Sequence, residues 1–256
     1  MKVRIIAKTT GAIGTEYEGK SIDDIIVGIA RVSSSRDTND LFDEPYKLLR
    51  HCALNQHWSV FESASLTFEV YTSRAISHEI IRHKSMSFQE FSLRYAEAID
   101  IEPIELREQS KNNRQSSTEI INPVNKHNYP YAYVVDSNIN NTETLYKQLI
   151  DNNVARETAR FILPLATTTK INMTANVRSI ITFLNARLHK TAQKEIRLVA
   201  EAIRDIFIKE CPIISECFFN FDNAYNIHIL ERLVLEKYKL YELIDSETGK
   251  VKRFIG

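Results

Sequence analysis

The stretch that decides the fold is Arg82-His83-Lys84-Ser85-Met86-Ser87-Phe88-Gln89-Glu90-Phe91-Ser92-Leu93-Arg94-Tyr95. Before it, isoleucines recur at helical spacing after Ser73, a suitable N-cap, which predicts a helix over residues 73–81. After Lys84 the period changes, because apolar and polar residues alternate as in a strand. The apolar phase slips by one residue at Gln89-Glu90, which predicts a bend or bulge at that point.

Past the bend, Ser92 and Arg94 are expected on one face of an extended segment, opposite the apolar residues. A guanidinium offers a fork of donors and a hydroxyl adds another, so this face suits a phosphate group. A buried helix followed by an edge strand with a solvated polar face explains the same pattern. Spacing alone leaves both interpretations open.

Length and composition favour one elaborated domain. The chain has 256 residues, of which 43% are hydrophobic, so it can bury a substantial core. The 33 basic and 33 acidic residues give no net charge, which argues against a dedicated nucleic-acid binder. No apolar run is nearly long enough to span a membrane, and the apolar stretch at the N-terminus is too short for a secretion signal. Three cysteines without a CxxC pair suit a reducing compartment, so we expect a cytoplasmic protein that binds neither nucleic acid nor membrane.

Two common ligand motifs are excluded. No glycine lies between Gly28 and Gly249, so the body of the chain has neither GxGxxG nor a P-loop. Side chains must therefore bind any nucleotide. The segment His78-Glu79-Ile80-Ile81-Arg82-His83 resembles the zinc motif HExxH, but its histidines are five residues apart. They lie about 140° apart around a helix and cannot share a metal face, so no catalytic metal is predicted.

The same signals assign the rest of the chain. Strands are predicted at 2–9, 64–71, 99–106 and 167–175. Helices are predicted from Ser21 to about Arg31 and at 43–55, 142–152, 154–163, 176–187 and 191–210. In the helix over 154–163, Ala155, Ala159, Phe161 and Ile162 form the predicted core side. A long polar excursion is expected at 112–141, and helical stretches in the tail, notably 227–241.

Arg82-His83-Lys84, followed after seven residues by Ser92, resembles the motif Arg-His-Arg, seven residues, Ser of flavin-dependent thymidylate synthases. Arg94 and Tyr95 extend this match. Further matching segments follow in the family's order: Ala30 to Ser33, His57 to Glu62, Ala159 to Leu165 and Asn176 to Ile196. The resemblance covers roughly residues 20–218. It implies an α/β (α+β) fold with a central mixed or antiparallel sheet flanked by helices, in a homotetramer with shared active sites. Residues 1–218 would form the catalytic domain and 219–256 a C-terminal helical extension.

The resemblance also implies the chemistry. In the family, FAD is reduced by NADPH, and a methylene group moves from methylene-tetrahydrofolate to carbon 5 of dUMP, which yields dTMP. Lys84 stands where the family usually has Arg, and Thr182 where it often has Asn or His. Two alternatives therefore stay open. One is flavin-dependent hydroxymethylation of dUMP, and the other is a non-catalytic nucleotide-binding protein of the same fold.

Site residues follow from the matching positions. For dUMP, the resemblance implies Glu79, Arg82, Glu90, Ser92, Leu93, Arg94, Arg160 and Arg187. For FAD, it implies Ser33, His57, Ser59, Glu62, Arg82, His83, Lys84, Glu90, Asn176, Arg178 and Thr182. Arg187 would be catalytic, since a fixed guanidinium stabilises negative charge that builds on the uracil ring. Asn176 also suits a helix N-cap, and His57 a capping or core histidine.

Overall fold

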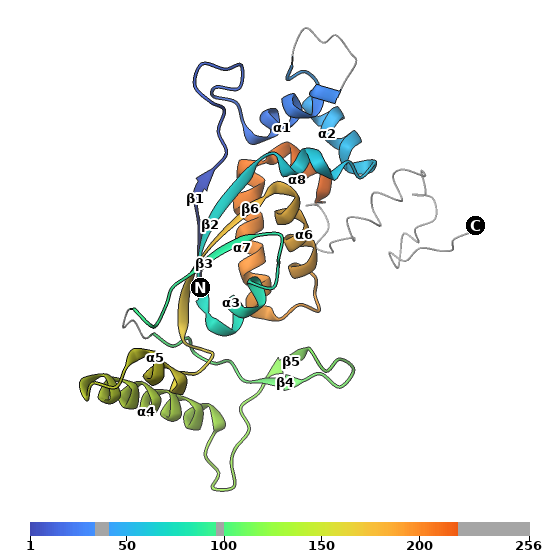
Figure 1. The fold of residues 1–256 in the computed structure, drawn as a ribbon. Coiled ribbons are helices and arrows are strands. Elements are labelled where there is room, and N and C mark those ends of the chain that lie inside the picture. Colours follow the sequence, from blue (N-terminus) through green and yellow to red (C-terminus); the bar gives the residue numbers. More distant parts are fainter. Residues whose placement is uncertain (34–40, 96–99, 220–256) are drawn as a thin grey trace. The chain divides into compact units, whose positions relative to one another are not determined.

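The computed structural model describes residues 1–33, 41–95 and 100–219, which form two compact units (Figure 1). The first unit contains Met1–Ala7, Thr67–Ala175 and His189–Ile203. The second contains Lys8–Leu66, Asn176–Leu188 and the described residues from Arg204 on. No helix in the described ranges is long and apolar enough to span a membrane. The predicted boundary between residues 218 and 219 and the cytoplasmic location stay predictions.

A four-stranded sheet lies largely in the first unit. Its strands follow the order β1 (Lys2–Lys8), β2 (Ser65–Ser73), β6 (Thr168–Asn176) and β3 (Ser87–Glu90) (Figure 1). β3 pairs antiparallel with β6, so that Phe88 lies opposite Met173 and Glu90 opposite Ile171. The sequence predictions of β1, β2 and β6 are correct to within two residues, and the predicted α/β fold with an antiparallel sheet and flanking helices is confirmed.

The central stretch is partly as predicted. Helix α3 (Arg74–Ile80) follows Ser73 in the N-cap position, and β3 ends at Glu90, where the bend is expected. The extended segment predicted past this point is wrong, because the Tyr95 N–H donates to the Ser92 carbonyl at 3.2 Å and closes a turn. Leu93 is buried inside that turn, so its alternation with neighbouring aromatic residues imitated a strand.

The predicted strand over 99–106 is also wrong. Ile101 forms only an isolated bridge with Thr167, and the strand β4 begins at Arg107. β4 (Arg107–Gln109) pairs antiparallel with β5 (Ser117–Ile120), which lies inside the predicted polar excursion. The two strands are short and polar, so they lack the apolar alternation by which a strand is recognised.

Helix α4 (Tyr131–Asp151) begins well before the predicted start at Thr142. Its partly buried positions before Thr142 are apolar and recur at helical spacing, but the largely exposed run over 136–141 is rich in Asp, Ser and Asn, which favour loops and hid the helix from the sequence. Asn138, Thr142 and Thr144 each donate to a main-chain carbonyl four residues earlier, at 2.8 Å. The polar excursion predicted over 112–141 is therefore wrong, since it contains both β5 and the start of α4.

The predicted helix over 154–163 is shorter in the structure. It consists of α5 (Arg156–Ala159) and a 3₁₀ turn, η3 (Arg160–Ile162). Ala159 is buried as predicted, but Ala155 is exposed and the Phe161 side chain is 77% exposed. The tighter 3₁₀ geometry changes the direction of side chains after Ala159, so Phe161 and Ile162 leave the core side.

Helices build the second unit. These are α1 (Ile22–Ala30), η1 (Arg31–Ser33), α2 (Pro45–Leu54), η2 (Trp58–Glu62), α6 (Val177–Arg187) and α8 (Pro212–Phe218). Ser21 caps α1 through a capping box with Asp24, at the predicted start of that helix. Asn176 caps α6 as predicted. Helix α7 (Lys194–Glu210) begins three residues later than predicted. The helical stretch predicted at 227–241 lies outside the described residues.

One cap comes from a different helix. Cys211, the N-cap residue of α8, makes no side-chain cap, and Asp23 of α1 accepts hydrogen bonds from Ile213 and Ile214 N–H instead. These bonds are 2.8 and 3.3 Å long. Burial raises the pKa of Asp23 to about 6, even though the two N–H donors favour the charged form. Burial also raises the pKa of the Cys211 thiol, which stays protonated.

Candidate active site

The first group of site residues surrounds Glu90, at the end of β3. Its Oε1 accepts hydrogen bonds from Ser77 Oγ and Thr169 Oγ1, both at 2.9 Å, and lies 3.4 Å from Arg74 Nη1. Arg74 also donates to the Phe91 carbonyl at 3.0 Å. The carboxylate and the chain that follows it are therefore fixed by donors from a helix and a neighbouring strand.

The local folds explain this convergence. Arg74 and Ser77 lie one turn apart on α3, so both face the same side of that helix. The β3–β6 register sets Glu90 opposite Ile171, and Thr169 precedes Ile171 by one strand period. Glu90 Oε2 has no hydrogen-bond donor among the described residues, and the buried Nε of Arg74 has no acceptor there. Glu90 thus offers one oxygen to a ligand while the other holds its orientation.

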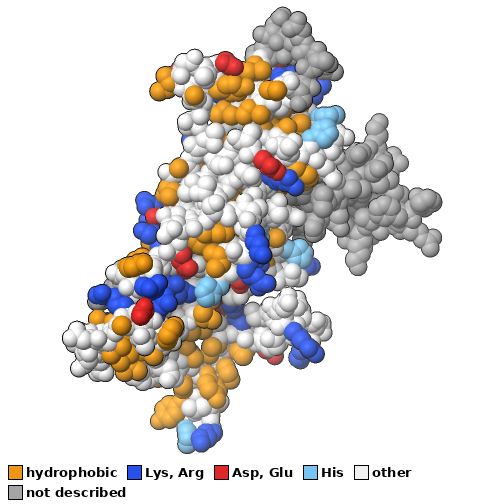
Figure 2. Space-filling view, in the orientation of Figure 1, with side chains coloured by type: hydrophobic (Ala, Val, Ile, Leu, Met, Phe, Trp, Pro, Cys, Tyr) orange, Lys and Arg blue, Asp and Glu red, His pale blue; other side chains and the backbone are white. Residues whose placement is uncertain are grey.

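The second group gathers two arginines at Glu157. The Arg94 guanidinium lies 3.5 Å from the Glu157 carboxylate, and Arg160 Nε donates to the Glu157 carbonyl at 3.3 Å. Ser92 Oγ accepts from the Arg94 N–H at 3.3 Å, so Ser92 belongs to the same turn. Figure 2 shows Lys and Arg side chains gathered beside α5 on the visible face. This arrangement provides two cations and a hydroxyl for an anion.

Between α3 and β3, the motif residues lie in a loop. Arg82 and Lys84 are exposed and make no hydrogen bond or ion pair with the residues that the structure describes. His83 is partly buried, and its N–H donates to the Ile80 carbonyl at 3.1 Å. Glu79, on α3, is partly buried. Among the described residues, the hydrogen bonds and ion pairs of Arg94 and Arg160 do not include Arg82.

In the second unit, Glu62 and Arg178 form an ion pair. The Arg178 guanidinium lies over the Trp58 ring, 5.9 Å from its centroid, and Trp58 stacks on Phe218 at 5.6 Å. Glu62 and Arg178 come from η2 and α6, which pack against each other. Two of the predicted FAD residues therefore meet beside an aromatic surface.

The other predicted residues of the second unit have mixed surroundings. Asn176 Oδ1 accepts from the Ser179 N–H at 2.8 Å, so its structural role as an N-cap is present. Thr182 is exposed and donates to the Arg178 carbonyl at 3.0 Å. His57 and Ser59 are exposed at the start of η2, and the His57 ring lies 5.7 Å from that of His51. Ser33 closes η1, and Arg187 is the last residue of α6 and partly buried.

Several residues around these groups escaped the sequence predictions. Arg74 and Ser77 carry a signal, because their spacing on a predicted helix is known from the sequence. Thr169 carries none, since its approach to Glu90 depends on the pairing register of two strands. Glu157 carries no signal either, because it is an exposed acid on a short helix. In the described part of the chain, no group of three or more His, Cys, Asp or Glu side chains could hold a metal ion.

Comparisons with known proteins identify the family. The sequence model described as "Thymidylate synthase complementing protein" matches residues 16–213. The flavin-dependent thymidylate synthase of Synechocystis sp. is 39% identical over 217 residues, which are 84% of this chain and 98% of that protein. The probable flavin-dependent thymidylate synthase of Paramecium bursaria Chlorella virus 1 is 34% identical over 219 residues, with the same coverage of both chains. The chain belongs to the flavin-dependent thymidylate synthase family.

A solved structure with the same fold agrees with this assignment. It is the crystal structure of the UMP/dUMP methylase PolB from Streptomyces cacaoi, bound with 5-Br dUMP. The two structures superpose with a TM-score of 0.65 at 26% sequence identity, over 85% of this chain and 94% of the methylase. The relatives of this chain are thus enzymes named as flavin-dependent thymidylate synthases.

Proposed function

We propose that the chain transfers a one-carbon unit from methylene-tetrahydrofolate to carbon 5 of dUMP, with FAD as cofactor and NADPH as reductant, and releases dTMP. The relatives' names and the dUMP methylase with the same fold support this assignment. The single structural observation that carries it is the meeting of Arg94 and Arg160 at Glu157, beside Ser92. These are predicted phosphate ligands, and a nucleotide monophosphate brings one compact dianion to such a place.

Phosphate binding and ring activation need different residues. Arg94, Arg160 and Ser92 would hold the phosphate of dUMP, a group that does not change during the reaction. Carbon 5 attacks a one-carbon unit only when negative charge builds on the uracil ring. Arg187 would face the ring oxygen that carries this charge, and a fixed cation stabilises the transition state more than the bound substrate.

The residues present fit a flavin dinucleotide. Arg82, Lys84 and Arg178 are exposed cations suited to its pyrophosphate, and Glu90 Oε2 is an acceptor without a donor among the described residues. His57, Ser59, Asn176 and Thr182 add polar groups, and Ser33, Glu62 and His83 complete the proposed set. When bound, FAD supplies the electron transfer between NADPH and the one-carbon unit. We include in the proposal a homotetramer whose active sites draw residues from more than one subunit.

Flavin binding and its response to dUMP test this proposal. We expect the purified full-length protein to show the absorption bands of an oxidised flavin, which NADPH bleaches. Addition of dUMP should shift these bands, because Glu90 is proposed to lie against both ligands. The proposed function would be refuted if the protein binds no flavin from excess FAD. It would also be refuted if saturating dUMP leaves the flavin spectrum unchanged.

A further inference from the structure

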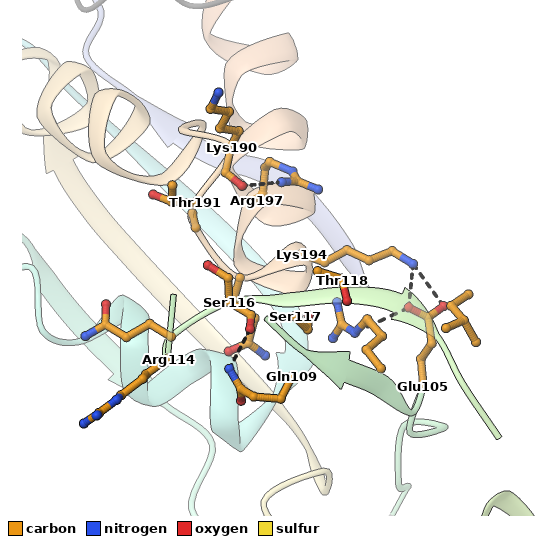
Figure 3. Close-up of a pocket in the computed structure, with 15 residues that line it drawn as sticks. Glu105, Gln109, Arg114, Ser116, Ser117, Thr118, Lys190, Thr191, Lys194 and Arg197 are labelled. Atoms are coloured by element: carbon orange, nitrogen blue, oxygen red, sulfur yellow. Dashed lines mark hydrogen bonds and ion pairs between the residues drawn. The ribbon is translucent and has the colours of Figure 1, made fainter. Parts of the chain in front are cut away.

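The β4–β5 hairpin and the segment that leads into α7 enclose a polar cavity of about 450 Å³ within the first unit (Figure 3). None of the proposed dUMP or FAD residues lines it. Its charged lining consists of five basic residues and one acidic residue: Arg107, Arg114, Lys190, Lys194, Arg197 and Glu105. We propose that this cavity binds the phosphate groups of a phosphorylated small molecule. The proposal does not depend on the function assigned above.

Two of the five cations are already neutralised. Glu105 accepts from Lys194 Nζ at 2.8 and 3.0 Å, and it lies 3.6 Å from Arg107 Nε (Figure 3). Arg107 also forms an ion pair with Glu195. Hydrogen bonds from Gln193 and Arg107 keep the pKa of Glu195 below its usual range, although burial opposes this effect. These ion pairs fix one wall of the cavity, and they do not cancel the charge of the other cations.

The remaining cations are available to an anion. Arg114 and Lys190 are exposed, extend from the rim, and have no ion pair with the described residues (Figure 3). Arg197 donates to the Lys190 carbonyl at 3.3 Å and lies 3.9 Å from Glu201. Long side chains on flexible stems can swing toward a ligand by rotamer changes alone. An entering phosphate would therefore gain up to three charge-assisted contacts without first breaking a buried ion pair.

The hairpin loop that carries Arg114 is held in shape by one side chain. Gln109 Nε2 donates to the carbonyls of Ser110, Asn113 and Ser116, at 3.3, 3.2 and 3.0 Å. The Ser110 N–H also bonds to the Ser116 carbonyl at 3.0 Å. This loop presents the hydroxyls of Ser116 and its neighbours to the cavity (Figure 3). A loop ordered before binding loses less entropy when a ligand arrives.

The chemistry of the lining selects the ligand class. Hydroxyl, amide and cationic groups dominate, and Ile120 and Ala192 are the apolar residues among those that line the cavity. The N-terminal end of the 17-residue α7 also lies at the cavity, where the positive end of the helix dipole favours an anion. A phosphate group supplies the several acceptor oxygens that such donors need. The volume is within the usual range for a small-molecule site.

Titration with inorganic pyrophosphate tests the proposal. We would measure its Kd calorimetrically with the full-length protein, in the presence of saturating dUMP, for wild type, Arg114→Ala and Lys190→Ala. Loss of one charge-assisted contact is expected to raise Kd about tenfold in each variant. Lys111→Ala is the matched control, because Lys111 lies on the same hairpin and carries the same charge but does not line the cavity.

A second variant separates a built site from general attraction. Gln109→Ala keeps the net charge but frees the loop, so we expect a several-fold higher Kd at an unchanged melting temperature. If NADP⁺ displaces pyrophosphate and AMP does not, the ligand of the cavity is a dinucleotide. If both displace it, the cavity binds phosphate compounds in general. Equal Kd values in wild type and both cavity variants, or equal losses in Lys111→Ala and the cavity variants, would overturn the proposal.

Discussion

The guanidinium of Arg94 lies 3.5 Å from the carboxylate of Glu157. Arg160 donates to the main-chain carbonyl of the same glutamate. The two arginines assigned to the phosphate of dUMP are 66 positions apart in the chain and still meet at one residue. The carboxylate of Glu157 is thus an internal anion beside the arginines that we propose for the substrate's anion. Both members of this ion pair are about half exposed, so the pair is weak and easily exchanged.

Glu157→Gln should therefore tighten substrate binding. Removal of the competing charge frees Arg94, and we expect the KM for dUMP to fall by about two- to fivefold with little change in kcat. Steady-state kinetics measure both constants. Glu143→Gln is the matched control, since it removes a partly exposed carboxylate paired with Lys147 on α4. A KM for Glu157→Gln that equals or exceeds the wild-type value would contradict this role.

The hydroxyl of Thr169 should stabilise the fold through Glu90. Thr169→Val keeps the shape of a buried side chain but removes its bond to the carboxylate, while Ser77 and Arg74 remain. We expect the free energy of unfolding to fall by about 1–2 kcal/mol in urea titrations. Thr174→Val removes an exposed hydroxyl that bonds to Thr67 at 3.0 Å and should cost less than about 0.5 kcal/mol. Equal losses in the two variants would show that the Glu90 contact adds nothing.

Asp23 should make stability depend on pH. Its pKa is raised to about 6 in the folded state, against about 3.9 in an unfolded chain, so the folded state binds this proton more tightly. The resulting stabilisation is full below pH 4 and is lost as the pH rises through 6. The free energy of unfolding of the wild type should therefore fall by on the order of 2 kcal/mol between pH 4 and 7, and Asp23→Asn should abolish this fall. Denaturant unfolding at several pH values measures it.

The comparison between variants isolates the carboxyl group of Asp23 from every other titratable group, because each variant changes one carboxylate alone. Asp205→Asn, at an exposed position, should leave the pH dependence of unfolding as in wild type. If the curves of wild type and Asp23→Asn run parallel from pH 4 to 7, the buried cap of α8 does not titrate as argued.

Features set by neighbouring residues were predictable from the sequence. The capping box at Ser21 and the N-cap at Asn176 both lie within four residues of the groups they bind. Helix α3 and strand β3 follow from the change of period around Lys84. The glycine-free body predicts that side chains bind the nucleotide, and this stays a prediction.

Features set by distant residues were not predictable. The bond between Thr169 and Glu90 depends on how β3 pairs with β6, and no local pattern encodes that register. The start of α4 was missed because its exposed positions between residues 136 and 141 hold Asp, Ser and Asn, which are typical of loops. The turn at Leu93 was taken for a strand because one buried residue between two aromatic residues also gives alternation.

Arg187 and Arg94 should differ in which kinetic constant they affect. Arg187→Ala removes a group that acts on charge developing in the ring, so kcat should fall by on the order of 10²-fold or more while dUMP binding persists. Arg94→Ala removes a phosphate ligand and should raise KM more than it lowers kcat. Oxidation of NADPH by the flavin should continue in Arg187→Ala. Wild-type turnover by Arg187→Ala at saturating dUMP would show that the assigned role is wrong.

The identity of the nucleotide product tests the central claim most directly. The full-length protein is incubated with FAD, NADPH, methylene-tetrahydrofolate and dUMP, and the nucleotide is analysed by mass spectrometry. We predict dTMP, formed only when all components are present. A hydroxymethylated nucleotide would show that water completes the reaction instead of hydride, and unchanged dUMP in the presence of bound, reducible flavin would contradict the proposed function.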